Sequence, residues 1–204
     1  LLRKAGHDVF TEYYLNDAGR QIDILCASVI CEMLSKKGLG VEKIDGLYKG
    51  SYIKEIASEL KSQNLKINER LVSTKMTGAV DDVVDALILE IKKIAGPDVF
   101  QTISDLAVLQ MTKLLQNDLA DFRVNQDGFY SEKSLFSKGK IENTCEIIKK
   151  NGNAYEKDGA LWFKSEQYGD EKDRVLRRSN GVWTYFANDL AYHYFKCKEK
   201  PHRI

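Results

Sequence analysis

A short strand-like run, a turn and an amphipathic helix near the start of the chain constrain its fold most. Residues 12–15 include two tyrosines and a leucine, and Asn16, Asp17 and Gly19 favour a tight turn. Either Asn16 or Asp17 is expected to cap the helix that follows. A strand, a turn and a packed helix form the basic unit of an α/β domain. The helix has apolar residues at the i, i+3, i+4 and i+7 spacing of a buried face: Ile22, Leu25, Cys26, Val29, Ile30, Met33 and Leu34.

The middle of the chain predicts further helices, followed by strands. Apolar residues at helical spacing lie within residues 47–60 and 80–94, and both stripes are more typical of a core than of a binding surface. A helix-breaking Gly96–Pro97 pair separates the second stripe from a helix that is expected to begin near Val99. Glycine-punctuated aromatic runs then predict strands, which cover residues 155–163 and 174–186.

Tyr185 and Asp189 lie four residues apart at a predicted strand-to-helix junction. In a helix that begins near Tyr185, the two side chains project from one face. An ionised carboxylate accepts a forked pair of hydrogen bonds from a planar guanidinium, and a tyrosine can stack on such a group or orient it. Polar pairs at this spacing more often lie on solvated helix faces. The spacing therefore leaves a guanidinium-binding pair and an ordinary solvated face as alternatives.

Five longer motifs follow one another along the chain. They are Glu-Tyr-Tyr-Leu-Asn-Asp-Ala-Gly-Arg-Gln at residues 12–21, Tyr-x-Gly-x-Tyr-Ile at 48–53, Tyr-Glu-Lys-Asp-Gly-Ala-Leu-Trp at 155–162, Gly-Asp-Glu-Lys-Asp-Arg-Val-Leu at 169–176, and Thr-Tyr-Phe-Ala-Asn-Asp-Leu-Ala-Tyr-His at 184–193. In this order, and over nearly the whole chain, they resemble arginyl-tRNA synthetase, a class I aminoacyl-tRNA synthetase. Residues 129–135 also resemble a family segment that usually contains Trp-Phe-Ser-Glu, with conservative changes at Phe129 and Tyr130.

The resemblance implies an α/β fold that is part of a Rossmann-like class I synthetase catalytic domain with a mixed helical and β insertion. Residues 1–40 are expected to form the first part of the catalytic domain, residues 41–173 an insertion that is helical and then β-rich, and residues 174–204 the return to the catalytic domain. Ligands of such folds bind at the carboxyl ends of the parallel strands. Asn16–Asp17 and Tyr185–Asp189 are therefore expected near one crevice.

The resemblance also implies the activity of an arginine–tRNA ligase, which activates L-arginine with ATP and transfers the arginyl group to arginine tRNA. In the family, the tyrosine and the aspartate of the last motif bind L-arginine, which gives this role to Tyr185 and Asp189. Asn16, Asp17 and Gln21 either shape the turn beneath the pocket or contact the substrate or the tRNA end. ATP is expected as a complex with Mg²⁺, and no tightly bound cofactor is expected. No catalytic residue is identified.

Two ATP-handling motifs of class I synthetases, His-x-Gly-His and Lys-Met-Ser-Lys-Ser, do not occur in the 204 residues. Such motifs stabilise the charge that builds on the ATP phosphates, and each electrostatic contribution of this kind is worth several kcal/mol. The family places the first motif upstream of residues 1–6, and the resemblance fades after Lys196. The chain is therefore expected to be a partial enzyme that is inactive alone. The alternative is a non-catalytic remnant that acts as an arginine-binding or interaction module.

The charge and cysteine content favour no other class of protein. The 31 basic and 30 acidic residues nearly cancel, so there is no overall attraction for a polyanion, and the arginines at 174, 177 and 178 are more typical of solvated surface than of a tRNA contact. The four cysteines lack metal-site spacing, and Asp189 with His193 supplies too few ligands, so no metal site is expected. Without an apolar run of about 20 residues or a leader, a cytoplasmic protein without a membrane partner is expected.

Overall fold

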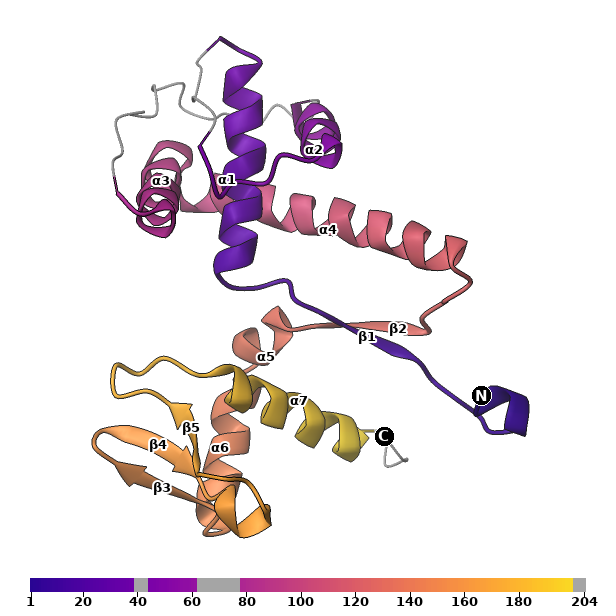
Figure 1. Cartoon of the computed structure of the whole chain (residues 1–204), viewed down its shortest axis with the longest axis vertical. Coiled ribbons are helices and arrows are strands. Elements are labelled where there is room, and N and C mark those ends of the chain that lie inside the picture. Colours follow the sequence, from indigo (N-terminus) through magenta and orange to yellow (C-terminus); the bar gives the residue numbers. More distant parts are fainter. Residues whose placement is uncertain (39–43, 62–77, 200–204) are drawn as a thin grey trace. The chain divides into compact units, whose positions relative to one another are not determined.

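The computed structural model describes residues 1–38, 44–61 and 78–199, and its internal contacts divide the chain into two compact units (Figure 1). The first unit comprises Leu1–Thr11 and Asp17–Asp127, and the second comprises Glu12–Asn16 and Gly128–Ile204. Residues 12–16 therefore belong to the second unit, although the residues directly before and after them belong to the first. The predicted three-part division at residues 40 and 173 stays a prediction.

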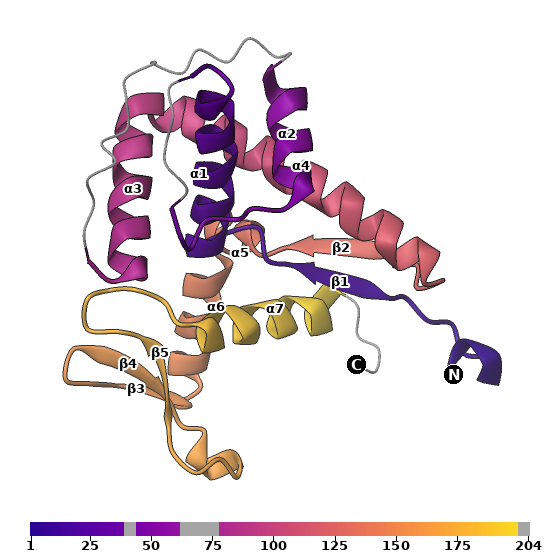
Figure 2. The same cartoon turned by 45° about the horizontal axis from the view of Figure 1, so that its top comes forward.

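Helices form the first unit (Figures 1 and 2). After a short 3-10 turn, η1 (Arg3–Ala5), the described part contains α1 (Arg20–Ser35), α2 (Ser51–Lys61), α3 (Val80–Ala95) and α4 (Pro97–Asp121). Helix α1 contacts each of the other three, which explains why ten of its sixteen residues are buried. The predicted helices are thus confirmed, and Pro97 begins α4 because proline suits a first helical turn whose N–H has no intrahelical partner.

The core of the first unit comes from the predicted apolar stripes. Its most deeply buried large side chains are Val29, Ile30, Leu34, Ile56, Leu60, Leu87, Ile91 and Ile103. Burial of each such side chain is worth roughly 1.5–3 kcal/mol relative to exposure. This core forms within one unit, so packing rather than helix propensity alone stabilises α1 to α4.

Gly19 stands at the N-cap of α1, with a φ of +83°, so the prediction that Asn16 or Asp17 occupies this position is wrong. The left-handed value of φ explains the choice of residue, because glycine adopts it without a steric penalty. Its carbonyl accepts hydrogen bonds from the backbone N–H groups of Ile22 and Asp23. The turn that follows residues 12–15 therefore extends as far as Gly19.

The second unit contains two small sheets and three helices within its described residues (Figure 1). Strands β1 (Glu12–Leu15) and β2 (Gly128–Ser131) pair in parallel, with Tyr14 opposite Tyr130. Strands β3 (Ala154–Lys157), β4 (Ala160–Phe163) and β5 (Arg174–Arg177) form an antiparallel sheet. The helices are α5 (Lys133–Ser137), α6 (Lys140–Lys150) and α7 (Tyr185–Glu199), and a 3-10 turn, η2 (Glu166–Tyr168), follows β4.

Turn residues decide how the predicted strands are divided. Asp158 and Gly159 both have positive φ and form the two-residue connection of the β3–β4 hairpin, so the run at 155–163 becomes two strands. The run at 174–186 is a strand only as far as Arg177, because the chain turns at Asn180–Gly181 before α7 begins. The core beneath these elements includes Leu135, Ile141, Leu176, Ala187 and Ala191.

Candidate functional site

The carboxyl ends of β1 and β2 lie at the same edge of the parallel pair. Glu132 directly follows β2, and its backbone N–H donates a hydrogen bond of 3.1 Å to the carbonyl of Leu15, the last residue of β1. The ladder of the two strands therefore ends at Glu132. In α/β sheets this edge is where ligands bind.

The carboxylate of Glu132 is held by Asn188 in the first turn of α7. Asn188 donates from Nδ2 to Oε1 of Glu132 over 3.0 Å, and only 6% of Asn188 and 5% of Glu132 are exposed. Because a carboxylate only accepts hydrogen bonds, the amide must present its NH₂ group to Glu132. The other amide atom, Oδ1, is buried without a hydrogen-bond partner in the described part of the chain.

Tyr14 on β1 places a second unpartnered polar atom in this region. Its hydroxyl oxygen is buried and has no hydrogen-bond partner among the described residues, while its ring packs edge-on against Tyr192 at 4.9 Å between centroids. Burial raises the pKa of Tyr14, and the negative charges of Glu132 and Asp189 raise it further. Both carboxylates therefore act on the pKa of one hydroxyl. We call Tyr14, Glu132, Asn188 and Asp189 the acceptor cluster.

The predicted pair Tyr185 and Asp189 lies on α7, which begins at Tyr185 as the sequence indicates. Tyr185 is 78% exposed and Asp189 is also exposed, so both are accessible to a ligand. Asp189 contributes its charge to the acceptor cluster, whereas no contact among the described residues joins the Tyr185 side chain to that cluster. Their roles in substrate binding stay predictions.

The three residues predicted near the pocket fall into different units. Asn16 is exposed at the end of β1 in the second unit, whereas Asp17 and Gln21 belong to the first unit. Oε1 of Gln21 accepts a hydrogen bond of 2.6 Å from the hydroxyl of Tyr48. Gln21 therefore contacts the Tyr-x-Gly-x-Tyr-Ile motif. The expectation that Asn16–Asp17 and Tyr185–Asp189 share a crevice stays a prediction.

Close packing explains the glycine of the Tyr-x-Gly-x-Tyr-Ile motif. A Cβ atom at Gly50 would lie 2.1 Å from Cε1 of Tyr52, inside the ring's van der Waals contact, so a larger residue requires the ring to move. The backbone N–H of Tyr48 also donates to Oγ of buried Ser28 over 3.0 Å. The motif thus fixes the segment before α2 against α1, which is a structural role.

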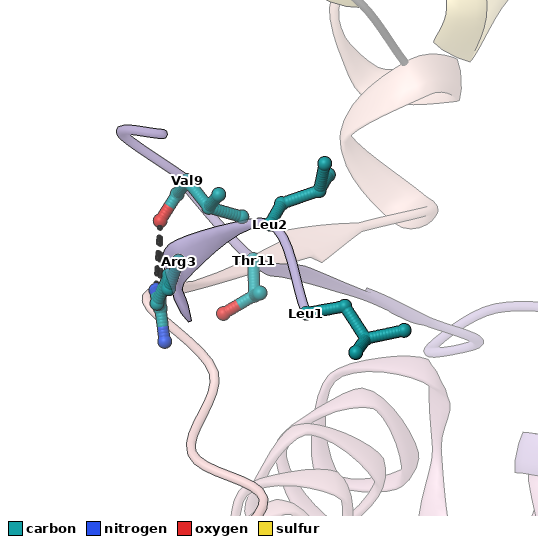
Figure 3. Close-up of a pocket in the computed structure, with 5 residues that line it drawn as sticks. All are labelled: Leu1, Leu2, Arg3, Val9 and Thr11. Atoms are coloured by element: carbon teal, nitrogen blue, oxygen red, sulfur yellow. Dashed lines mark hydrogen bonds between the residues drawn. The ribbon is translucent and has the colours of Figure 1, made fainter. Parts of the chain in front are cut away.

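A hollow of about 410 Å³ in the first unit is lined by Leu1, Leu2, Arg3, Val9 and Thr11 (Figure 3). Figure 3 shows the guanidinium of Arg3 directed at the carbonyl of Val9, to which it donates from Nη2 over 2.8 Å. The remaining lining is mostly aliphatic. None of the predicted site residues borders this hollow.

Two of the three arginines at 174, 177 and 178 have side-chain partners within the second unit. Arg174 donates from Nε and Nη2 to the two carboxylate oxygens of Asp170 over 2.6 and 2.7 Å, and the guanidinium of Arg177 lies 5.4 Å from the centre of the Trp183 ring. These contacts give both side chains a structural role. A tRNA contact there stays a prediction.

No group of three or more His, Cys, Asp or Glu side chains is placed to hold a metal ion within residues 1–38, 44–61 and 78–199. Among the helices that the structure describes, none has a segment long and apolar enough to cross a bilayer.

Sequence reasoning did not select Tyr14, Glu132 or Asn188. Glu132 carried a usable signal, since it is a charged residue directly after a strand in the segment that resembles Trp-Phe-Ser-Glu. Asn188 lies inside the last motif, directly before Asp189. For Tyr14, nothing in the alternation of β1 distinguishes a site residue from a core residue.

Comparison with known proteins identifies the family. The model of the family described as "tRNA synthetases class I (R), catalytic domain" matches residues 1–203. A relative named arginine–tRNA ligase from Thioalkalivibrio sulfidiphilus is 38% identical over 213 residues, which cover 100% of this chain and 36% of that protein. Another of the same name from Legionella pneumophila (strain Paris) is 40% identical over 205 residues, which cover 96% of this chain and 35% of that protein.

A crystal structure from Campylobacter jejuni, described as an arginyl-tRNA synthetase, superposes with a TM-score of 0.73 and 29% identity. The match covers 98% of this chain and 38% of that one. The chain thus spans about a third of the length of these relatives. The predicted α/β, Rossmann-like synthetase fold and the resemblance read from the five motifs are confirmed, and the chain belongs to the family of class I tRNA synthetases (R), whose catalytic domain it matches.

Proposed function

We propose that this chain carries the L-arginine pocket of an arginine–tRNA ligase. The observation that supports this most is the acceptor cluster, in which the carboxylates of Glu132 and Asp189 raise the pKa of the buried Tyr14 hydroxyl, and Oδ1 of Asn188 has no hydrogen-bond partner among the described residues. Two negative charges and an unused acceptor at one sheet edge suit a cation that carries several N–H donors.

Guanidinium matches this arrangement better than ammonium does. Arginine presents five N–H donors in a planar fork, whereas lysine presents three donors on a compact point charge. A lysine ammonium therefore leaves some of the acceptors unsatisfied, and an unsatisfied buried polar group costs about 1–3 kcal/mol. Tyr185, exposed at the start of α7, is proposed to stack on or orient the same substrate.

The remaining steps belong to the proposed activity of the whole protein. ATP, bound as a complex with Mg²⁺, would activate L-arginine to an arginyl-adenylate, and the arginyl group would pass to arginine tRNA in the cytoplasm. Asn16, Asp17 and Gln21 are proposed to shape the pocket or to contact the substrate or the tRNA end. The 204 residues alone lack the two ATP-handling motifs, so we propose that they bind L-arginine without forming arginyl-tRNA.

Calorimetric titration of the purified chain with L-arginine tests the pocket. Asp189→Ala is expected to weaken binding at least about 10-fold, because it removes a charge-assisted hydrogen bond. Asp118→Ala is the matched control, since Asp118 is an exposed aspartate on α4 that makes no ion pair in the described part of the chain. L-Citrulline, which is nearly isosteric with arginine but uncharged, should not compete.

Far-ultraviolet circular dichroism of each variant establishes that the chain is folded before binding is compared. A folded wild-type chain that does not bind L-arginine contradicts the proposal. Measurable arginyl-tRNA formation by the pure chain contradicts its second part, the absence of aminoacylation by these residues alone.

A further inference from the structure

We infer that Asn188 is a positioning residue whose side-chain amide holds the Glu132 carboxylate in the orientation that receives the substrate guanidinium. This inference rests on the proposed function, because it assigns Glu132 to the L-arginine pocket. It adds a residue that does not itself need to touch the substrate.

Glu132 and Asn188 are among the few buried polar side chains of the second unit, and they are bonded to each other over 3.0 Å. A buried carboxylate is stable only when donors compensate for its lost hydration. The Asn188 amide is one such donor, and it fixes Oε1 of Glu132 in space. Holding one of the two oxygens limits the rotation of the carboxylate as a whole.

Two successive hydrogen bonds link Asn188 to the antiparallel sheet. Its backbone N–H donates to the carbonyl of Thr184 over 3.2 Å, and Oγ1 of Thr184 donates to the carbonyl of Val175 on β5 over 2.6 Å. The first turn of α7 is thereby joined to a strand of the antiparallel sheet. Binding groups held by rigid elements lose less freedom when a ligand arrives, which is the condition for strong and selective binding.

Buried polar atoms without a partner indicate that the Asn188–Glu132 pair does more than satisfy its own hydrogen bonds. Tyr14 OH and Asn188 Oδ1 are the buried side-chain atoms without a hydrogen-bond partner in the part of the chain that the structure describes. Asn188 is bonded directly to Glu132, and the charge of Glu132 acts on Tyr14. A buried amide oxygen without a partner calls for an explanation, and a ligand that donates a hydrogen bond to Oδ1 of Asn188 provides one.

A double-mutant cycle in L-arginine binding separates positioning from simple structural support. Calorimetry on the folded chain compares wild type, Asn188→Ala, Glu132→Gln and the double variant. Asn188→Ala is expected to weaken binding about 10- to 100-fold, the range for a lost hydrogen bond to a charged group. If Asn188 acts through Glu132, the double variant should bind within about twofold of Glu132→Gln alone.

Two further variants sharpen the comparison. Asn188→Asp keeps the side-chain volume but places a negative charge against Glu132, so it should weaken binding at least as much as Asn188→Ala. Asn143→Ala is the matched control, because Asn143 is exposed on α6 in the same unit, and it should bind like wild type. If Asn188→Ala does not fold, the test passes to Asn188→Asp.

The outcomes distinguish this inference from the proposed function. Wild-type binding that survives Asn188→Ala or Asn188→Asp within twofold overturns the inference alone. Losses that multiply in the double variant also overturn it, because they show that Asn188 acts independently of Glu132. Absence of L-arginine binding by the folded wild-type chain overturns the proposed function and this inference with it.

Discussion

The hydroxyl of Tyr192 lies 2.7 Å from Oε1 of Glu12, joining residues 180 positions apart in the sequence. Lys196 completes the contact, with Nζ 2.8 Å from the Tyr192 hydroxyl and 3.2 Å from Oε1 of Glu12. Tyr192 is buried and its ring also packs on Tyr14 and Tyr130. This contact fastens β1 to α7, the two elements that supply Tyr14 and Asn188 to the acceptor cluster.

Tyr192→Phe should therefore destabilise the chain. The change keeps the ring packing and removes a hydroxyl that bonds a charged, largely buried carboxylate, so the free energy of unfolding should fall by about 1.5–3 kcal/mol. Urea denaturation followed by circular dichroism measures the change. Tyr194→Phe on the same helix is the control, because the Tyr194 hydroxyl has no hydrogen bond in the described part of the chain, and its effect should stay within about 0.5 kcal/mol. Equal effects of the two variants would count against the role of the Glu12 contact.

Tyr14→Phe should change the free energy of unfolding in the opposite direction. The Tyr14 hydroxyl is buried without a well-formed hydrogen bond in the described part of the chain, and such a group costs about 1–3 kcal/mol, so its removal is expected to raise the free energy of unfolding by about 1 kcal/mol. Tyr13→Phe, next to it on β1, provides the comparison and should change little. A clear loss of stability in Tyr14→Phe would mean that the hydroxyl has a partner in solution.

The cysteines should divide into one reactive and three unreactive thiols. Burial raises the pKa of the thiols of Cys26, Cys31 and Cys145 to about 12, so at pH 8 these groups remain protonated and poorly nucleophilic. Cys197 is exposed near the end of α7. Titration with a chromogenic disulfide at pH 8 should release one equivalent quickly, and the other three only after denaturant is added. Rapid labelling of all four thiols in the folded chain would contradict the burial of the three cysteine side chains on α1 and α6.

The ion pair between Asp170 and Arg174 should make stability depend on acid pH. Hydrogen bonds from Arg174, together with the backbone N–H of Glu171, lower the pKa of Asp170 to about 2. Because this value lies below that of an unfolded aspartate, about 3.9, the contribution is fully present above about pH 4 and is lost as the pH falls through 2. The melting temperature of wild type should therefore exceed that of Asp170→Asn at pH 5, and the difference should shrink at pH 2. A difference in melting temperature that does not change with pH would contradict this explanation.

Local pattern was sufficient to predict most elements. The stripe from Ile22 to Leu34 predicts α1 because a 3.6-residue period buries one face of any helix, and Gly96–Pro97 marks the α3–α4 boundary through backbone geometry alone. The same reasoning failed at residues 174–186, where strand-forming residues continue past Arg177 but the chain turns. It also misplaced the cap of α1, because turn-forming residues specify a turn without fixing which of them ends it.

The five ordered motifs are enough to identify the family, and the four-residue spacing of Tyr185 and Asp189 is enough to place them on one helix. Only the tertiary structure brought Glu132 to Asn188, 56 residues away, and Glu12 to Tyr192. The physical reason is that a helix or strand period depends on neighbouring residues, whereas a buried hydrogen bond depends on where the packed core places two distant backbones. The acceptor cluster depends on contacts between distant residues, and for that reason no sequence motif predicts it.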